Sequence, residues 1–310
     1  MIEVDITVVG SLNMDIVAVV DHMPGAGETV KTASAQLYSG GKGANQAVAA
    51  ARQGARVRMV GAVGGDAFGE SICMQLVKSG VGIEGVFTKD APSGVALITV
   101  ERDGQNRIVV CEGANALLAP DDVERACGAD PLPPGSAMLL QNEIPRATVV
   151  HAIRLAHRRG WRVVWNVAPV ERIPAGLLTN RDIIAVNEKE ASMLVGFEVI
   201  DDQSARKAAE QLLAIGPGLV IVTLGDLGSL ALSPDFGVIR IPAFSVPVVD
   251  TTAAGDTFIG VFAADWDGVQ SPELSLRKAA AAAALCVSRR GAQSSIPTRE
   301  ETETFLRQHA

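Results

Sequence analysis

Towards the C-terminal end of the chain, small residues lead through a carboxylate into an apolar segment, Val249-Asp250-Thr251-Thr252-Ala253-Ala254-Gly255-Asp256-Thr257-Phe258. We expect a helix to begin here and to end at about Trp266, so that its first N–H groups, from Ala253 to Asp256, face an anion such as phosphate. The Asp256 carboxylate could then accept the proton of an attacking hydroxyl, while the N–H groups stabilise the developing charge. The alternative is that Asp256 only complements the helix dipole.

Two polar side chains follow the first apolar strand, in the segment Gly10-Ser11-Leu12-Asn13-Met14-Asp15. The i, i+2 spacing of Asn13 and Asp15 places both on one side of an extended backbone. A carboxylate accepts hydrogen bonds from sugar hydroxyls, and an amide both donates and accepts them. An Asx turn that caps the strand is the alternative for this pair.

A glycine-rich loop follows at Ser39-Gly40-Gly41-Lys42-Gly43-Ala44-Asn45-Gln46. Its glycines would let the backbone approach a ligand closely, and the helix that follows would turn its free N–H groups back towards the loop. The Walker pattern does not fit because Gly43 follows Lys42, and the dinucleotide pattern G-x-G-x-x-G lacks its third glycine. A purely structural loop is the alternative.

Two more patterns stand at the ends of strands in the second half of the chain. Asn187 and Glu190 are spaced to share one side of a first helical turn, where they could serve a Mg²⁺–water network. The same spacing is that of an N-cap and its N3 glutamate. The segment Thr223-Leu224-Gly225-Asp226-Leu227-Gly228 ends another strand in a turn that could contact phosphates or simply form a hairpin.

The composition narrows the class of partner. The chain has 27 Lys and Arg against 35 Asp and Glu, a formal net charge of −8 and a pI of about 5.1. An acidic chain has little attraction for a phosphate backbone, so no nucleic acid is expected. The longest apolar run, residues 279–287, is far shorter than the roughly 20 residues that span a bilayer, so no membrane partner is expected either.

The cysteines and the N-terminus bear on the compartment. The four cysteines are far apart and form no CxxC pair, so neither a zinc site nor a disulfide framework is expected. Acidic residues stand where a secretory signal would carry basic ones. Both observations favour a cytoplasmic protein.

Short β-branched runs alternate with Ala-rich helical stretches along most of the chain. Strands are predicted at residues 6–9, 57–60, 137–140, 163–165, 183–186 and 219–223, and helices at 44–52, 68–78, 147–159, 188–194 and 205–214. The strands show little polar alternation, as expected when helices cover both faces of a parallel sheet. The sequence therefore predicts a layered, Rossmann-like α/β/α domain over residues 1–310, with ligands beyond the carboxyl ends of the strands.

Two stretches break this alternation, at about residues 14–38 and 94–112. They carry strand patterns at residues 17–21, 33–38, 95–100 and 107–111, and Asp103-Gly104 gives a turn signal in the second stretch. We interpret them as one small separate β-sheet that forms a lid over the ligand crevice. Extra strands on the main sheet are the alternative.

Taken together and in this order, the motifs resemble those of the ribokinase-like sugar kinases, the PfkB carbohydrate kinase family. The similarity runs from about residue 5 to residue 307, and both signature regions of the family are present, at residues 39–63 and 250–263. Within the family, residues 40–50 and 290–293 are most similar to the ribose-phosphorylating members. The resemblance implies ATP-dependent phosphorylation of the 5-hydroxyl of D-ribose, with Mg²⁺ as cofactor and without a covalent enzyme intermediate.

The resemblance also implies roles for single residues. Asp256 would be the catalytic base, and the anion hole would be Ala253, Ala254 and Gly255. The sugar would be bound by Asp256 together with Asn13, Asp15, Gly41, Lys42, Asn45 and Glu143. ATP would be contacted by Asn187, Glu190, Thr223, Gly225, Gly228 and Gly255. K⁺ would be held, mainly by backbone carbonyl oxygens that suit a hard cation, by Asp250, Thr252, Cys286, Arg289, Gly291 and Ser295.

The family further implies a lid that closes on the sugar and is often built into a homodimer interface, which fits the two β insertions. Ala280 stands where some members carry a histidine near the adenine. Deoxyribose, fructose, a modified sugar or a nucleoside are alternative substrates, although an aromatic content of 4% leans against a nucleoside. A sugar-binding regulator without turnover is disfavoured by Asp256 and its anion-hole segment, and a nicotinamide oxidoreductase by the missing dinucleotide pattern.

Overall fold

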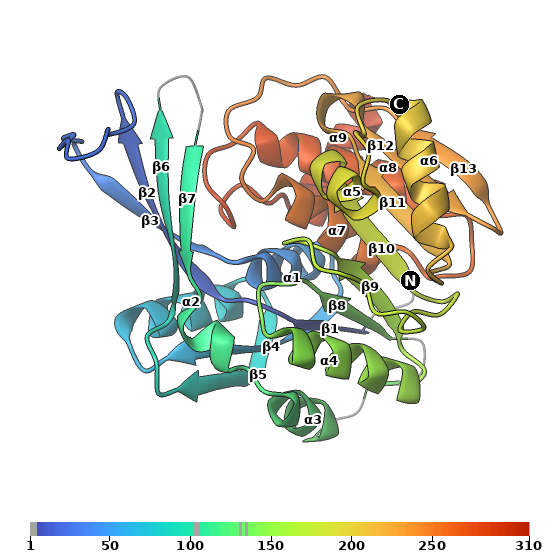
Figure 1. The fold of residues 1–310 in the computed structure, drawn as a ribbon, viewed down its shortest axis with the longest axis horizontal. Coiled ribbons are helices and arrows are strands. Elements are labelled where there is room, and N and C mark those ends of the chain that lie inside the picture. The colour runs from blue at the N-terminus through green and yellow to red at the C-terminus, as the bar shows by residue number, and fades with distance from the viewer. Residues whose placement is uncertain (1–4, 102–105, 130–131, 134–135, 310) are drawn as a thin grey trace.

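The computed structural model describes residues 5–101, 106–129, 132–133 and 136–309. Its centre is a nine-stranded sheet with the order β13-β12-β11-β10-β9-β8-β1-β4-β5 (Figure 1). The strands are β1 (Asp5–Val9), β4 (Arg56–Gly64), β5 (Val81–Lys89), β8 (Ala137–Leu140), β9 (Arg162–Asn166), β10 (Ile183–Asn187), β11 (Leu219–Thr223), β12 (Ser229–Ser233) and β13 (Gly237–Ile241). Neighbours from β5 to β11 pair in parallel, and β12 and β13 extend the sheet in antiparallel pairing.

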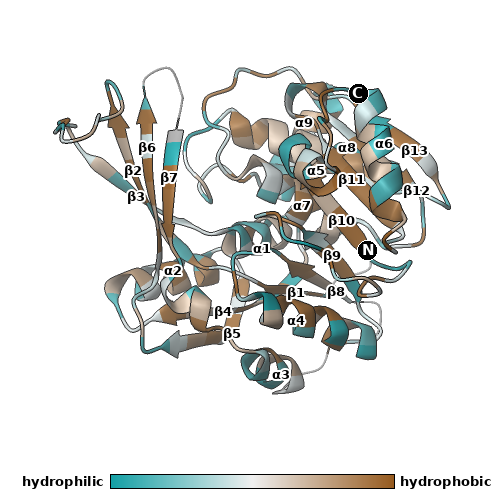
Figure 2. Ribbon diagram, in the orientation of Figure 1, coloured by the Kyte–Doolittle hydropathy of each residue, from teal (hydrophilic) through white to brown (hydrophobic). Residues whose placement is uncertain are grey.

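Helices cover both faces of this sheet, which confirms the predicted α/β/α layers. In β8, Ala137 and Leu139 belong to the core on one face, while Met138 and Leu140 belong to the core on the other. The first face is covered by α1 (Lys42–Arg52), α2 (Ala67–Lys78), α7 (Ala254–Asp265) and α8 (Glu273–Val287). The second is covered by α3 (Pro120–Ala129), α4 (Arg146–Arg158), α5 (Glu188–Val195) and α6 (Asp202–Leu213), while α9 (Arg299–Gln308) packs on α8. Figure 2 shows the apolar strands of the main sheet between helices that carry polar residues on their outer sides.

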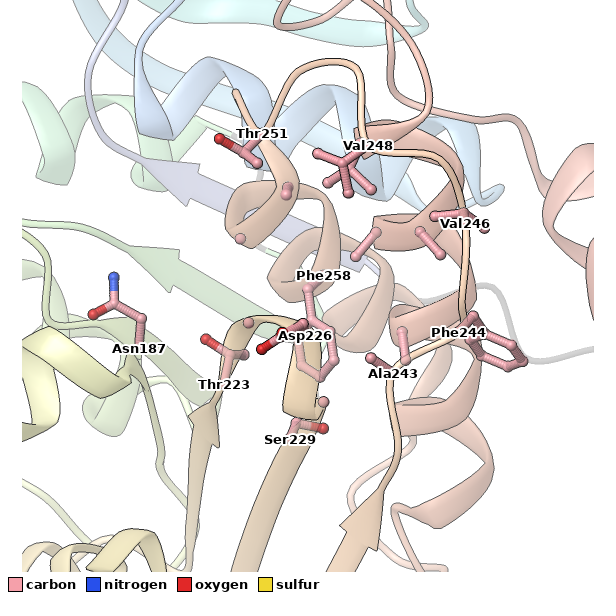
Figure 3. Close-up of a pocket in the computed structure, with 18 of the residues that line it drawn as sticks. Asn187, Thr223, Asp226, Ser229, Ala243, Phe244, Val246, Val248, Thr251 and Phe258 are labelled. Atoms are coloured by element: carbon pink, nitrogen blue, oxygen red, sulfur yellow. The ribbon is translucent and has the colours of Figure 1, made fainter. Parts of the chain in front are cut away.

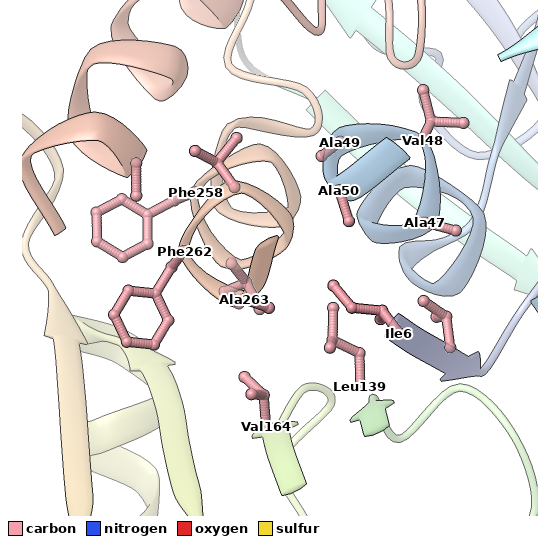
Figure 4. Close-up of a cluster of buried hydrophobic side chains, with 14 of the residues drawn as sticks. Ile6, Ala47, Val48, Ala49, Ala50, Leu139, Val164, Phe258, Phe262 and Ala263 are labelled. Atoms are coloured by element: carbon pink, nitrogen blue, oxygen red, sulfur yellow. The ribbon is translucent and has the colours of Figure 1, made fainter. Parts of the chain in front are cut away.

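Small residues bring α1 and α7 close together over the sheet (Figure 4). Ala47, Ala49 and Ala50 of α1 are fully buried in the shared core. A Cβ at Gly260 of α7 would lie 2.5 Å from the carbonyl oxygen of Gln46, so only glycine permits this approach. The contact matters for function because these two helices carry the glycine-rich loop and Asp256.

A second, four-stranded sheet stands away from the main body (Figure 1). Its order is β3-β2-β6-β7, with β2 (Asn13–Val20), β3 (Ala35–Gly40), β6 (Gly94–Glu101) and β7 (Asn106–Cys111). The pairs β2–β3 and β6–β7 are antiparallel, and the central β2–β6 pair is parallel. The predicted joining of two distant β segments into one separate sheet is confirmed, and the alternative of extra strands on the main sheet is wrong. The Asp103-Gly104 turn signal lies outside the described residues.

Some elements were not predicted. The edge strand β5 was missed because its two glycines and a glutamate interrupt the apolar run. The turn after Thr223 forms the short 3-10 helix η2 (Gly225–Leu227) and leads into β12 antiparallel to β11, so the hairpin alternative holds there. A second 3-10 helix, η1 (Gly113–Leu117), follows β7. Among the described helices, none is both long enough and apolar enough to cross a bilayer.

Candidate active site

The polar residues singled out above gather where the parallel strands end. The order of the sheet reverses direction between β1 and β8, because β4 and β5 follow on one side and β9 to β11 on the other. A crevice beyond the carboxyl ends of the strands is expected at such a point. The residues at or just beyond these ends include Ser11 after β1, Glu143 after β8, Asn166 in β9, Asn187 in β10 and Thr223 in β11.

Asp256 lies in the first turn of α7, where the glycine-rich loop meets it. Asn45 Nδ2 donates a hydrogen bond to Asp256 Oδ2 at 3.0 Å, and Gln46 Nε2 donates one to Oδ1, also at 3.0 Å. Asp256 is 8% exposed, and the Oδ1 atom of Asn45 is buried with no hydrogen-bond partner among the described residues. The structure thus brings together a carboxylate oriented by two amides and an acceptor that is open to a hydroxyl group.

The N-terminus of α7 has no side-chain cap. Ala253 occupies the N-cap in the left-handed region at φ 61°, and no side chain accepts a hydrogen bond from the first turn. The Ala254 N–H contacts the Thr251 carbonyl oxygen at 3.3 Å, and a Cβ on Gly255 would meet open space. Side chains cap α2, α5, α6 and α9, whereas α4 and α8, like α7, have no side-chain cap. An uncapped helix N-terminus beside Asp256 is the geometry that an anion hole requires.

Glu143 and Ser11 hold the N-terminus of α1. Ser11 Oγ donates to Glu143 Oε2 at 2.5 Å, and the Lys42 N–H donates to the same oxygen at 3.1 Å. The Gly43 N–H donates to Ser11 Oγ at 3.3 Å. A Cβ at Gly43 would lie 2.6 Å from the Ser11 nitrogen, so glycine is needed for this approach. Glu143 therefore fixes the glycine-rich loop through one carboxylate oxygen.

Asn13 and Asp15 begin β2 at the base of the small sheet, on the same face. The Asn115 amide in η1 donates to Asn13 Oδ1 at 2.8 Å and also bonds both backbone groups of Leu12. Because its oxygen is occupied, Asn13 offers its NH₂ group to a ligand. Met14, between the two, turns the other way and packs in the core.

Asp15 is buried close to other carboxylates. It is 6% exposed, and burial, followed by the negative charges of Glu143 and Asp256, raises its pKa to about 7. Burial lowers the pKa of Lys42, but the charges of Asp256, Glu143 and Glu190 outweigh this effect and leave it above its ordinary value. The half-buried Lys42 ammonium therefore stays charged beside three carboxylates, where it suits the negative charge of a transferring phosphoryl group.

A cavity of about 630 Å³ lies between β11, η2, α7 and α8 (Figure 3). Asn187, Thr223, Gly225, Gly228 and Gly255, all predicted to contact ATP, line it. Apolar side chains form much of its wall, including Phe244, Val246, Val248 and Phe258, and Ala280 lies among them. A mostly apolar hollow that opens at the uncapped N-terminus of α7 can hold a base at one end and phosphates at the other.

Asn187 and Glu190 form a capping box. Asn187 Oδ1 accepts from the Glu190 N–H at 2.8 Å, and the Asn187 N–H donates to Glu190 Oε2 at 2.9 Å. The capping alternative is therefore correct for this pair. It does not consume the other oxygen of Glu190, whose pKa is raised by burial first, with the charge of Asp256 also contributing. Among the described residues, no three His, Cys, Asp or Glu side chains gather as a metal centre.

Most residues of the predicted cation loop lie together. Asp250 Oδ1 accepts from the Thr252 N–H at 2.9 Å, and its Oδ2 accepts from the Gly291 N–H at 2.9 Å. Cys286 Sγ lies 3.5 Å from the Thr252 carbonyl oxygen and 3.1 Å from Ser295 Oγ. The Arg289 side chain instead pairs with Glu301 of α9 at 2.8 Å, so only its carbonyl group could face a cation.

Sequence reasoning gave no role to several buried polar residues that the structure places at the site. They are Ser11, Gln46, Asn115, Gln141 and Asn166. Gln46 and Asn166 stood inside recognised segments, but the sequence did not show which way their side chains point.

Comparison with known proteins agrees with this geometry. A family model described as "pfkB family carbohydrate kinase" matches residues 4–299. The ribokinase of Haemophilus influenzae is 40% identical over 98% of this chain and 99% of its own length, and the deoxyribokinase of Salmonella typhimurium is 37% identical over 97% and 98%. The structure of Arabidopsis thaliana ribokinase complexed with ribose and ATP is similar with a TM-score of 0.86, at 33% identity over 98% of this chain and 99% of that one.

Proposed function

Because the chain belongs to the pfkB family of carbohydrate kinases and is a sugar kinase, we propose that it transfers the γ-phosphoryl group of ATP to the 5-hydroxyl of D-ribose. The products are D-ribose 5-phosphate and ADP. Ribose is favoured over other sugars by the relatives and the solved structure that carry the name ribokinase. All four cysteines are free thiols, which supports a reducing compartment such as the cytoplasm for this reaction.

The observation that carries the proposal is the position of Asp256. Its carboxylate accepts hydrogen bonds from Asn45 and Gln46, and it stands in the first turn of an uncapped helix that opens into the nucleotide cavity. We assign it as the base that takes the proton of the 5-hydroxyl as the oxygen attacks the γ-phosphorus and ADP leaves. The N–H groups of Ala254 and Gly255, together with Lys42, stabilise the charge on the transferring group.

The sugar hydroxyls fit the polar groups on the other side of Asp256. Asn13 presents its NH₂ group, Asn45 presents an unpaired oxygen, and Asp15 is a buried acceptor. Because a carboxylate that accepts sugar hydroxyls is stabilised in its charged form, sugar binding reverses part of the effect that raises the pKa of Asp15. Gly41 and Glu143 complete the proposed sugar contacts.

The residues present fit Mg²⁺ and a monovalent cation. Mg²⁺ is commonly bound by one or two carboxylates and the substrate phosphates, so Glu190 and Asn187 suffice to help place it where it neutralises phosphate charge. Carbonyl oxygens in the segments 250–252 and 286–295 suit K⁺, with Asp250 supplying the negative charge. The segment 250–252 leads directly into Ala253, so a cation there would support the anion hole.

We propose that the small sheet is the lid and that a second copy of the chain packs against it. Leu37, Ile16, Leu97 and Val109 form one row across its four strands, on the face opposite to Asp15. In this row Leu37, Leu97 and Val109 are 57%, 45% and 60% exposed. A continuous row of exposed apolar side chains is a common mark of an interface.

Deoxyribose is the second candidate substrate, because relatives named deoxyribokinase are 37% identical to the chain over nearly its full length. The two sugars differ only in the 2-hydroxyl. A site built to hydrogen-bond a hydroxyl rejects the analogue that lacks it, so comparing kcat/KM for the two sugars decides between them.

The test measures ADP release from Mg-ATP with D-ribose, deoxyribose, fructose and nucleosides, with and without K⁺, for the wild type and Asp256→Asn. We expect ribose to have the highest kcat/KM, K⁺ to raise the rate, and the variant to lose about 10²–10⁴-fold in kcat. A higher kcat/KM for another sugar would overturn the ribose assignment. Full turnover by Asp256→Asn would overturn the assignment of the base.

A further inference from the structure

Gln46 is the centre of a buried chain of amides behind Asp256. Its Nε2 atom donates to Asp256 Oδ1 at 3.0 Å and to Asn166 Oδ1 at 3.3 Å, and its Oε1 atom accepts from Gln141 Nε2 at 2.6 Å. Gln46 and Gln141 are fully buried, and Asn166 is 5% exposed. This row of amides connects α1 and α7 with the carboxyl ends of β8 and β9.

Two acceptors, the Ala185 carbonyl oxygen and the Asp256 carboxylate, determine the orientation of every amide in this row. Asn166 Nδ2 donates to the Ala185 carbonyl oxygen at 3.0 Å, so Asn166 must turn its oxygen towards Gln46. The Asp256 carboxylate likewise requires an NH₂ group. Gln46 therefore presents its NH₂ group to both neighbours, and its oxygen is left for the NH₂ group of Gln141. Each of these contacts excludes the flipped orientation of Gln46.

Gln141 is poorly explained as a residue that only stabilises the core. Its Oε1 atom is buried without a hydrogen-bond partner among the described residues, and the preceding strand β8 is entirely apolar. A buried unpaired amide oxygen is a cost that an apolar side chain of the same shape avoids. The contact that the Gln141 amide does make is the one that orients Gln46.

We propose that Gln46 is the positioning residue that holds the Asp256 carboxylate in place, and that Gln141 acts only through Gln46. This inference rests on the proposed role of Asp256 as the base. A hydrogen bond to the charged form of a carboxylate favours that form and restricts its rotation. The charged groups that also face Asp256 are Lys42 of α1, Asp15 of β2 and Glu190 of α5.

The experiment compares Gln46→Met, Gln141→Met and the double variant, because methionine keeps the length of the side chain and removes the amide. Gln53→Met is the matched control: Gln53 follows the last turn of the same helix, and within the described part of the chain its side chain bonds to Pro297 and Thr302. For each protein, kcat and KM for D-ribose are measured from pH 5 to 9, together with the melting temperature. Asp256→Asn is measured in parallel.

We expect Gln46→Met to lower kcat about 10- to 100-fold, to leave the KM for ribose within about threefold, and to move the acid limb of the kcat–pH profile to higher pH. Gln141→Met should act in the same direction and more weakly. In the double variant, the loss should equal that of Gln46→Met alone, because a residue that acts through Gln46 has no further effect once the amide is gone. Gln53→Met should leave kcat and the pH profile unchanged.

Two results would overturn the inference. One is a Gln46→Met enzyme whose acid limb and kcat match those of Gln53→Met, whatever its melting temperature. The other is a double variant in which the two losses multiply, which would mean that Gln141 acts independently of Gln46. If Asp256→Asn loses turnover while Gln46→Met retains it, only the positioning role fails. If Asp256→Asn itself retains turnover, both this role and the proposed base are wrong.

Discussion

Replacing Asp15 by asparagine should make the folded protein more stable, increasingly so as the pH rises, while it destroys sugar binding. Burial and the charges of Glu143 and Asp256 raise the pKa of Asp15 from 3.8 to about 7. The folded state therefore binds this proton more tightly than the unfolded chain does. The contribution of Asp15 to stability is greatest below about pH 4 and is lost as the pH rises through 7.

The size of the stability change follows from the difference between the pKa of Asp15 in the unfolded and in the folded state. From 3.8 to about 7, at about 1.4 kcal/mol for each pH unit, the ionised Asp15 costs roughly 4 kcal/mol of folding free energy at pH 8. At pH 5 only about 1.6 kcal/mol of that cost is present. We therefore expect urea unfolding at pH 5, 6, 7 and 8 to show a stability difference between Asp15→Asn and the wild type. The difference in unfolding free energy should grow in favour of Asp15→Asn by roughly 2–3 kcal/mol from pH 5 to pH 8. Because the comparison is between pH values, the packing of asparagine itself cancels.

The control for this measurement is Asp235→Asn, at an exposed carboxylate in the turn between β12 and β13. The difference in unfolding free energy between Asp235→Asn and the wild type should be the same at every pH. A stability difference between Asp15→Asn and the wild type that stays constant, or that shrinks as the pH rises, would refute the reasoning. Binding gives a second check: D-ribose should release protons from the wild type at pH 6, measured by calorimetry in buffers of different ionisation enthalpy, and Asp15→Asn should bind it far more weakly.

Three further perturbations test other parts of the structure. Gly260→Ala places a Cβ 2.5 Å from the Gln46 carbonyl oxygen, so we expect the free energy of unfolding in urea to fall by about 1–3 kcal/mol and kcat to fall as well. An unchanged kcat would contradict the tight contact between α1 and α7. Ala253→Gly relieves a left-handed backbone at φ 61° and should raise stability by up to about 1 kcal/mol without raising kcat, whereas a loss of stability would contradict the strain. Leu97→Lys should convert a dimer to a monomer by light scattering, while Val238→Lys, 43% exposed on β13, should not; identical masses for both variants and the wild type would exclude the lid interface.

The layered fold could be predicted because its signal is local. Continuous apolar strands such as residues 183–186 require cover on both faces, and the carboxyl ends of parallel strands define the ligand edge. The position of Asp256 could be predicted for the same reason, since a run of small residues followed by an apolar helix marks an open helix N-terminus. β5 was not predicted because two glycines and a glutamate interrupt its apolar run, as in a loop.

The partners of each functional side chain could not be predicted, because they come from distant parts of the chain. Gln46 stands next to Asn45 in sequence, and nothing local shows that both amides turn to Asp256, more than two hundred residues away. Asn187 and Glu190 illustrate the opposite case. Their spacing alone favoured a cap over a metal site, and the structure shows that the cap forms.

The way these residues are distributed has a consequence for how the enzyme discriminates between sugars. Asn45 and the proposed base Asp256 belong to α1 and α7, which pack together in the main core, and Ser11 accepts a hydrogen bond from the N-terminus of α1. Asn13 and Asp15 instead begin a strand of the small sheet. If Asn13 and Asp15 bind the sugar as proposed, a displacement of that sheet changes their contacts with the sugar hydroxyls but leaves Asp256, Asn45 and Gln46 in place. Sugar affinity should therefore respond to the lid, whereas the chemical step should respond to the α1–α7 contact.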